Sequence, residues 1–128
     1  MNNPLISHGA PDEVFVMGDI GVQLDVATLI SRVNAAPRAE LDIREGATAD
    51  LISIARRNSF DRFKVVSTER LEEPLLLVTL RFYGQRQFWI VDGTHRLHAR
   101  HRSGKPKTRY VAVASAMVHD LVQPRRLY

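Results

Sequence analysis

The feature that most constrains this chain is a long apolar stretch that contains one short break and then leads directly into a helical pattern. Residues 74–83 and 87–91 are rich in leucine, β-branched and aromatic side chains, and Gly84-Gln85 separates the two runs. Such a pair of runs predicts an antiparallel hairpin. Phe88 and Trp89 are neighbours on the second strand, so one is expected to face the core and the other to be exposed. Helical spacing then predicts a helix over residues 94–103, which a glycine and a proline end.

Apolar residues in the rest of the chain recur at helical or at strand spacing. The first helical pattern follows Asp25, which is a suitable N-cap residue. Strands and helices that alternate in this way predict a mixed α/β fold, with a small mixed sheet and flanking helices. Helices are expected over residues 26–33, 49–58 and 115–122, and strands over residues 14–17, 63–66 and 109–114.

The length of the chain predicts a single domain, because 128 residues suffice for one hydrophobic core and would leave two cores marginal. We expect an irregular arm over residues 1–13, one domain over residues 14–122 and a short basic end over residues 123–128. The hydrophobic fraction of 45% and the charged fraction of 25% are those of an ordinary soluble globular protein.

Features missing from the sequence exclude some classes of chemistry. The chain has no cysteine, so disulfides, cysteine-bound zinc and a thiol nucleophile are excluded. It also has no signal-peptide pattern and no apolar segment of roughly 18 residues, the length that a membrane span requires. We therefore expect a cytoplasmic protein without a membrane partner.

The candidate site is the junction where the second apolar run passes through Asp92 and Gly93 into a helix. The first amides of a helix lack internal partners, and the helix dipole favours an anion there. Gly93 allows a ligand to approach the backbone closely, and Thr94, His95 and Arg96 add side-chain donors. The junction therefore predicts a phosphate-binding site at Gly93, Thr94, His95 and Arg96. An ordinary turn, a helix cap and a solvated basic face would use the same residues.

Acidic and histidine side chains around this junction offer two kinds of candidate metal ligand. Asp92 can bind a metal ion, orient His95 or accept a hydrogen bond from a sugar hydroxyl. His95, His98 and His101 follow one another at three-residue spacing, but His101 is rotated by about 120° from His95 around the helix. Three such side chains do not readily share a tetrahedral zinc site. Asp92 is therefore the candidate metal ligand, and the histidines are expected at the surface or the edge of the core.

Positive charge is concentrated in the second half of the chain. The net charge is +4, and between Arg81 and Arg109 the only carboxylate is Asp92. A solvated basic face explains part of this excess, and a surface that binds the phosphates of nucleic acid is the alternative. The candidate nucleic-acid contacts are Arg100, Arg102, Lys105 and Lys107.

At these residues the sequence resembles the ParB/sulfiredoxin superfamily. The resemblance covers roughly residues 42–122, with an L-x-x-S-I-like helix pattern at residues 51–55 and the turn Asp-Gly-Thr-His-Arg at residues 92–96. The hairpin and a closing strand after a glycine complete the pattern. The resemblance implies a compact α/β domain that binds the phosphates of a nucleotide at this turn, and it implies that Ser53 faces the site.

The departures from this pattern narrow the implied function. Thr94 stands where sulfiredoxins carry their catalytic cysteine, so sulfinic acid reduction by that mechanism is excluded. ParB proteins usually carry Gly-Glu-Arg-Arg at this turn, and Thr94 replaces the glutamate. No helix-turn-helix domain follows in the sequence given, so a partition function is not expected. The turn looks closer to the kinase-like branch of the superfamily.

These features together predict a nucleotide-binding protein, namely a metal-dependent ATPase or phosphotransferase that uses ATP or another nucleotide with Mg²⁺. Phosphoryl transfer needs positioning, charge neutralisation and a carboxylate. The candidate catalytic residues are Glu45, Asp92 and His95. Two alternatives stay open at this point: a DNA-binding or DNA-cleaving module, and a non-enzymatic interaction protein on the same fold.

Overall fold

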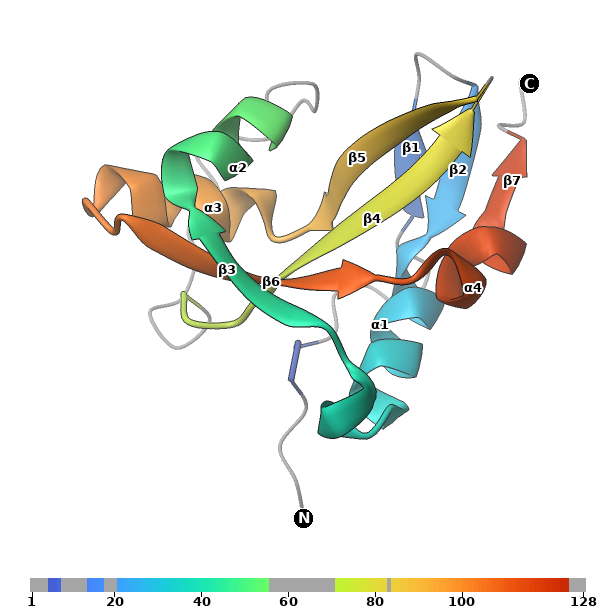
Figure 1. Cartoon of the computed structure of the whole chain (residues 1–128), viewed down its shortest axis with the longest axis horizontal. Helices are drawn as coiled ribbons and strands as arrows, with labels where there is room; N and C mark the ends of the chain where they lie inside the picture. The colour runs from blue at the N-terminus through green and yellow to red at the C-terminus, as the bar shows by residue number, and fades with distance from the viewer. Residues whose placement is uncertain (1–4, 8–13, 18–20, 56–70, 83, 125–128) are drawn as a thin grey trace.

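The computed structural model describes residues 5–7, 14–17, 21–55, 71–82 and 84–124, which form a mixed α/β fold with two sheets (Figure 1). This fold class is the predicted one. The predicted strand over residues 63–66 and the end of the predicted second helix lie outside the described residues. In chain order the elements are β1 (Val14–Met17), β2 (Val22–Asp25), α1 (Val26–Ala35), a 3₁₀ turn (Arg38–Glu40), β3 (Ile43–Ala47), α2 (Thr48–Ala55), β4 (Leu75–Phe82), β5 (Gln85–Asp92), α3 (Thr94–Arg102), β6 (Lys107–Val113), α4 (Ser115–Val118), a second 3₁₀ turn (His119–Leu121) and β7 (Val122–Pro124).

The larger sheet has the strand order β3-β6-β4-β5 and is mixed, as the sequence predicts. Strands β4 and β5 form the predicted antiparallel hairpin, whereas β6 returns parallel to β4. The smaller sheet has the order β1-β2-β7. The sequence predicted β1 but neither of the other two strands of this sheet.

The two faces of the larger sheet belong to different hydrophobic clusters. Because side chains alternate along a strand, Leu76 and Val78 pack toward α1, whereas Leu75 and Leu77 pack toward α2 and α3. The pair α2 and α3 covers only the part of its face around Leu75 and Ile90. Among the described residues, no helix covers the remainder of that face.

Helix α1 forms where it is predicted and extends to Ala35. Asp25 caps it, because its carboxylate accepts hydrogen bonds from the Thr28 amide at 3.0 Å and the Thr28 hydroxyl at 2.7 Å. These bonds stabilise the ionised carboxylate and lower the pKa of Asp25. The helix buries an apolar stripe with a spacing of three and four residues: Val26, Leu29, Ile30 and Val33.

The described part of the predicted N-terminal arm is irregular but packs into the core. Ile6 is fully buried, and Leu5 is 8% exposed. The Asn34 side-chain amide binds the Ile6 backbone twice: Oδ1 accepts from the Ile6 N–H at 3.0 Å, and Nδ2 donates to the Ile6 carbonyl at 2.8 Å. Asn34 thus satisfies both polar groups of a buried residue that has no strand partner.

Replacing Asn34 with alanine is expected to destabilise the protein by about 2 kcal/mol, because both polar groups of the Ile6 backbone lose their partner. Urea unfolding measures the difference. Ser31→Ala on the same helix is the control; the exposed Ser31 hydroxyl bonds only to the Ala27 carbonyl, so a change below about 0.5 kcal/mol is expected. Equal effects of the two substitutions would contradict this account of Asn34.

The C-terminal segment differs from the predicted helix over residues 115–122. A four-residue helix and a 3₁₀ turn are followed by β7, in which Val122 pairs with Leu24 of β2. Pairing with the small sheet therefore ends the helix early. Arg32 connects this segment to α1. It donates to the Met117 carbonyl at 2.9 Å and forms a bidentate ion pair with Asp120, in which both bonds measure 2.8 Å.

The Arg32 hydrogen bonds lower the pKa of Asp120 to about 2. A carboxyl group whose pKa is lowered on folding contributes stability above its unfolded pKa of about 3.9, and this contribution disappears as the pH falls through the folded pKa. Arg32→Gln is therefore expected to raise the pKa of Asp120 toward its ordinary value. NMR titration of the side-chain carboxyl carbon measures this, and an unchanged pKa would show that Arg32 is not its cause.

Candidate functional site

The junction predicted as the site has the expected backbone course. Strand β5 ends at Asp92, and α3 begins at Thr94. Gly93 has a φ of +97° and serves as an N-cap without a side chain. A Cβ atom at Gly93 would lie 2.6 Å from Leu75 Cδ2 and 2.8 Å from a terminal nitrogen of Arg96, so the position requires glycine for both its φ angle and its space.

Arg96 lies beneath this turn, where its guanidinium group is almost completely buried. The residue is 3% exposed, and one terminal nitrogen donates to Asp92 Oδ2 and to the Pro74 carbonyl, both at 3.0 Å. Its Nε is buried and has no hydrogen-bond partner among the described residues. The Arg96 guanidinium group, which the sequence predicted to bind a ligand, is thus used largely in hydrogen bonds within the protein. It ties the end of β5 to the residue that precedes β4.

The remaining residues of the turn are more accessible. Thr94 and His95 are half-buried, and the first turn of α3 contains no acidic side chain. The Thr94 hydroxyl forms no hydrogen bond within the described part of the chain. An N-terminal turn without a side-chain cap and without an acid leaves its amides available to an external anion.

The structure does not bring the other predicted catalytic residue to this turn. Glu45 is exposed on β3, whereas Asp92 ends β5, and these strands are the opposite edges of the sheet. Three strand spacings of about 4.8 Å separate them. Asp92 itself is 11% exposed and paired with Arg96. The predicted set Glu45, Asp92 and His95 is therefore not assembled in one place.

Ser53 lies on the exposed side of α2, and its hydroxyl donates to the Ala49 carbonyl at 3.2 Å within the helix. It lines a small hollow of about 210 Å³ together with Arg86 and Phe88 of β5. The turn at Asp92 does not contribute to that hollow. Ser53 and the phosphate-binding candidates thus belong to different parts of the described surface.

The four candidate nucleic-acid contacts separate into two groups. Arg100 is 11% exposed and joins α3 to its surroundings, since it donates to Thr108 Oγ1 and Glu72, both at 3.1 Å, and to the Lys107 carbonyl. Arg102, Lys105 and Lys107 are exposed around the turn between α3 and β6. Three of the four side chains are therefore accessible to a polyanion, and Arg100 acts within the fold.

Among the described residues, no group of three histidine or acidic side chains is placed to hold a metal ion. No helix among those residues combines the length and the apolar character needed to cross a bilayer.

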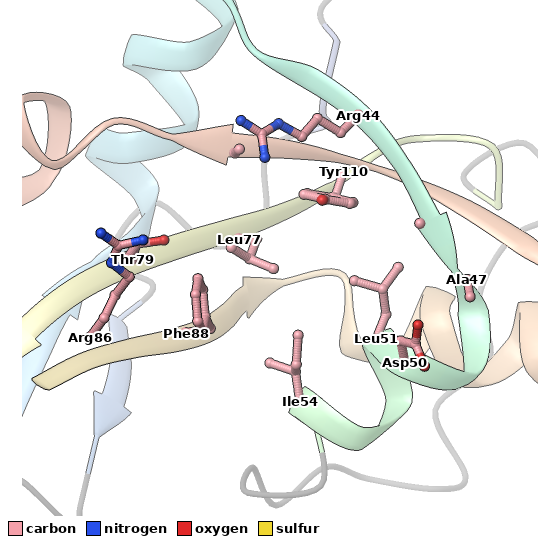
Figure 2. A pocket seen from close by; sticks show the side chains of 12 residues that line it. Arg44, Ala47, Asp50, Leu51, Ile54, Leu77, Thr79, Arg86, Phe88 and Tyr110 are labelled. Carbon is pink, nitrogen blue, oxygen red and sulfur yellow. The ribbon is translucent and has the colours of Figure 1, made fainter.

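A hollow lies on the face of the larger sheet beside α2 (Figure 2). Its volume is about 430 Å³. Leu77 and Tyr110 rise from the sheet, Leu51 and Ile54 of α2 form one side, and Phe88 stands at the edge (Figure 2). The polar side chains around the hollow are Arg44, Asp50, Thr79 and Arg86.

Comparison with protein-family models, with curated proteins and with solved structures finds no match to this chain. The structure thus defines a small mixed α/β protein with an uncapped helix start and a hollow sheet face. The ParB/sulfiredoxin resemblance rests on the sequence pattern alone and stays a prediction.

The sequence does not predict the hollow as a site, although it does predict the exposure of one aromatic side chain on β5. The alternation of Phe88 and Trp89 predicts that only one of them is buried, and Trp89 is 2% exposed while Phe88 is 44% exposed. Extending the same alternation backward places Arg86 beside Phe88 on the open face. The walls contributed by α2 and the β6 strand depend on long-range packing and had no comparable signal.

Gly93→Ala is expected to destabilise the protein by about 3 kcal/mol, because the new methyl group combines a left-handed backbone with overlap against Leu75. Gly104→Ala is the matched control, since Gly104 has a φ of +74° but no atom within 4 Å of the added Cβ. A loss of about 1 kcal/mol is expected there. Chemical denaturation compares the two, and equal losses would show that crowding at Gly93 is relieved without penalty.

Proposed function

We propose that this protein binds a nucleotide through its phosphate groups at the start of α3. The observation that carries the proposal is an N-terminal turn with no side-chain cap and no acid, opened by a glycine in the left-handed conformation. Anions bind such helix termini because the unpaired amides and the helix dipole act in the same direction. The sequence resemblance supports the same ligand class.

The residues of the turn have distinct roles in this proposal. The phosphate oxygens accept hydrogen bonds from the first amides of α3, and the Thr94 hydroxyl is an additional donor. Arg96 does not contact the ligand directly. Its buried guanidinium group, held between Asp92 and the Pro74 carbonyl, fixes the conformation of Gly93.

The described residues fit a phosphate group better than they fit Mg²⁺. The one carboxylate at the turn, Asp92, is 11% exposed and paired with Arg96, and Glu45 lies on the opposite edge strand. A metal ion at Asp92 would compete with this buried ion pair. The proposal is therefore one of nucleotide binding, and we derive no hydrolysis or transfer step through a metal.

Thr94→Val is expected to weaken nucleotide binding about tenfold, because a hydrogen bond to a charged phosphate is lost while the side-chain volume is kept. Isothermal titration and thermal shift with ATP, ADP, CTP and GTP, with and without Mg²⁺, measure this effect. At a hundred times the Kd, a nucleotide adds about 2.7 kcal/mol of stability. Arg96→Ala is unsuitable as the test, because an unpaired buried Asp92 would itself destabilise the fold by about 3–5 kcal/mol.

Ser31→Ala on α1, where the exposed hydroxyl bonds to the Ala27 carbonyl, is the control for this experiment and is expected to leave nucleotide affinity unchanged. A nucleotide response that Thr94→Val does not reduce would place the phosphates elsewhere. The absence of any nucleotide response, together with salt-sensitive binding of short duplex DNA, would replace the proposal by the nucleic-acid alternative, which the exposed Arg102, Lys105 and Lys107 would then serve.

A further inference from the structure

The hollow on the open sheet face carries an arrangement of charge that the fold does not explain. Arg81 of β4 and Arg86 of β5 are direct cross-strand partners on this face. Like charges in such positions are destabilising. Both side chains are exposed, and neither forms an ion pair with any residue that the structure describes. An anion between them would remove the repulsion.

Arg44 on the opposite side of the hollow is different. Its guanidinium group binds the Asp42 carboxylate through three hydrogen bonds of 2.7–3.1 Å. The charge of Arg44 is thus largely neutralised, and its pKa is raised mainly by these bonds. Among the described residues, the positive charge that has no acidic partner lies at the Arg86 end of the hollow.

The interior of the hollow is apolar and aromatic. Phe88 is 44% exposed although it lies in the middle of β5, and Leu77 and Tyr110 continue the same surface across the sheet. Ile54 faces them from α2 (Figure 2). Aromatic surfaces of this kind bind flat rings by stacking and edge contacts. The volume of about 430 Å³ lies within the usual range of roughly 300–1,000 Å³ for small-molecule sites.

We propose that this hollow is a binding site for a small planar aromatic molecule that carries one anionic group. The ring lies against Phe88 and Leu77, and the carboxylate or phosphate binds Arg86 with Arg81 beside it. Thr79, which pairs directly with Phe88, is the neutral donor nearest this end. Asp50 lies at the opposite end of the hollow (Figure 2) and accepts a hydrogen bond from a donor group on the far side of the ring.

A single small molecule fits this site better than a continuous strand of nucleic acid. Helix α2 closes one side of the hollow through Leu51 and Ile54, and Asp50 repels any second phosphate at the end away from Arg86. A nucleic-acid strand that ran through the hollow would carry phosphates at both of its ends, including the end where Asp50 lies. The site uses none of the residues at the start of α3, so it is independent of the proposed nucleotide function.

Three naphthalene probes test the proposal: naphthyl phosphate, naphthoate and the neutral naphthol. Amide NMR spectra of the full chain are recorded during titration with each probe. We expect saturable shifts at Phe88, Ala112 and Ile54, with both anions binding at least roughly tenfold more tightly than naphthol. A preference between phosphate and carboxylate then identifies the anion. Shifts confined to Thr94 and its neighbours, or equal affinity for all three probes, would overturn the proposal.

Substitutions separate the charge from the ring contact. Arg86→Gln is expected to lower the affinity for both anions at least roughly tenfold and to leave naphthol binding within about twofold. Phe88→Ala is expected to weaken all three probes. Arg102→Gln, an exposed arginine at the far end of α3, is the matched control and should change none of them. If Arg102→Gln weakens the anions as much as Arg86→Gln does, the attraction is general charge and the site does not exist as proposed. An unchanged amide spectrum outside the hollow shows that each variant is folded.

Discussion

The β4–β5 hairpin is the constraint on which the rest of this structure depends. Its alternation sends Leu76 and Val78 to the core under α1 and Leu75 and Leu77 to the core under α2 and α3. Its antiparallel register aligns the residues of the open face, and the end of its second strand sets the position of Gly93. One pairing register therefore determines both hydrophobic clusters, the candidate phosphate turn and the aromatic hollow, since a shift by one residue would exchange the two faces.

The buried ion pair of Arg96 and Asp92 constrains the structure locally, as the register of the hairpin constrains the whole sheet. Burial of two charges is tolerated because they bond to each other and because the Pro74 carbonyl accepts a further hydrogen bond. The pair connects three segments that meet at this point: the residue before β4, the end of β5 and the first turn of α3. In this way a cation near a helix N-terminus, which the dipole disfavours, becomes part of the fold.

Local patterns in the sequence were sufficient for the elements whose own residues determine them. The Asp25 cap with its apolar stripe predicted α1, and the glycine break predicted the hairpin. Strands β2, β3 and β7 were not predicted, because they are short and depend on partners far away in the chain; β7 pairs with β2 across about a hundred residues. The turn at Gly93 was located correctly, but the burial of Arg96 was not, because it depends on Pro74 and Leu75, which reach the turn only after the sheet has formed.

Both candidate sites place cations where folding alone disfavours them. They differ in whether an acidic side chain of the protein neutralises those cations. At the start of α3, Asp92 neutralises Arg96, so the turn is stable without a ligand and offers mainly its amides and the Thr94 hydroxyl. On the open face, Arg81 and Arg86 have no acidic partner among the described residues. Phe88 adds apolar surface that remains exposed to water. Two unfavourable features at one place are more readily explained by one ligand that relieves both than by two unrelated accidents of the surface. A bound anion would therefore stabilise the sheet face more than the helix start, although only the helix start carries a recognisable sequence motif.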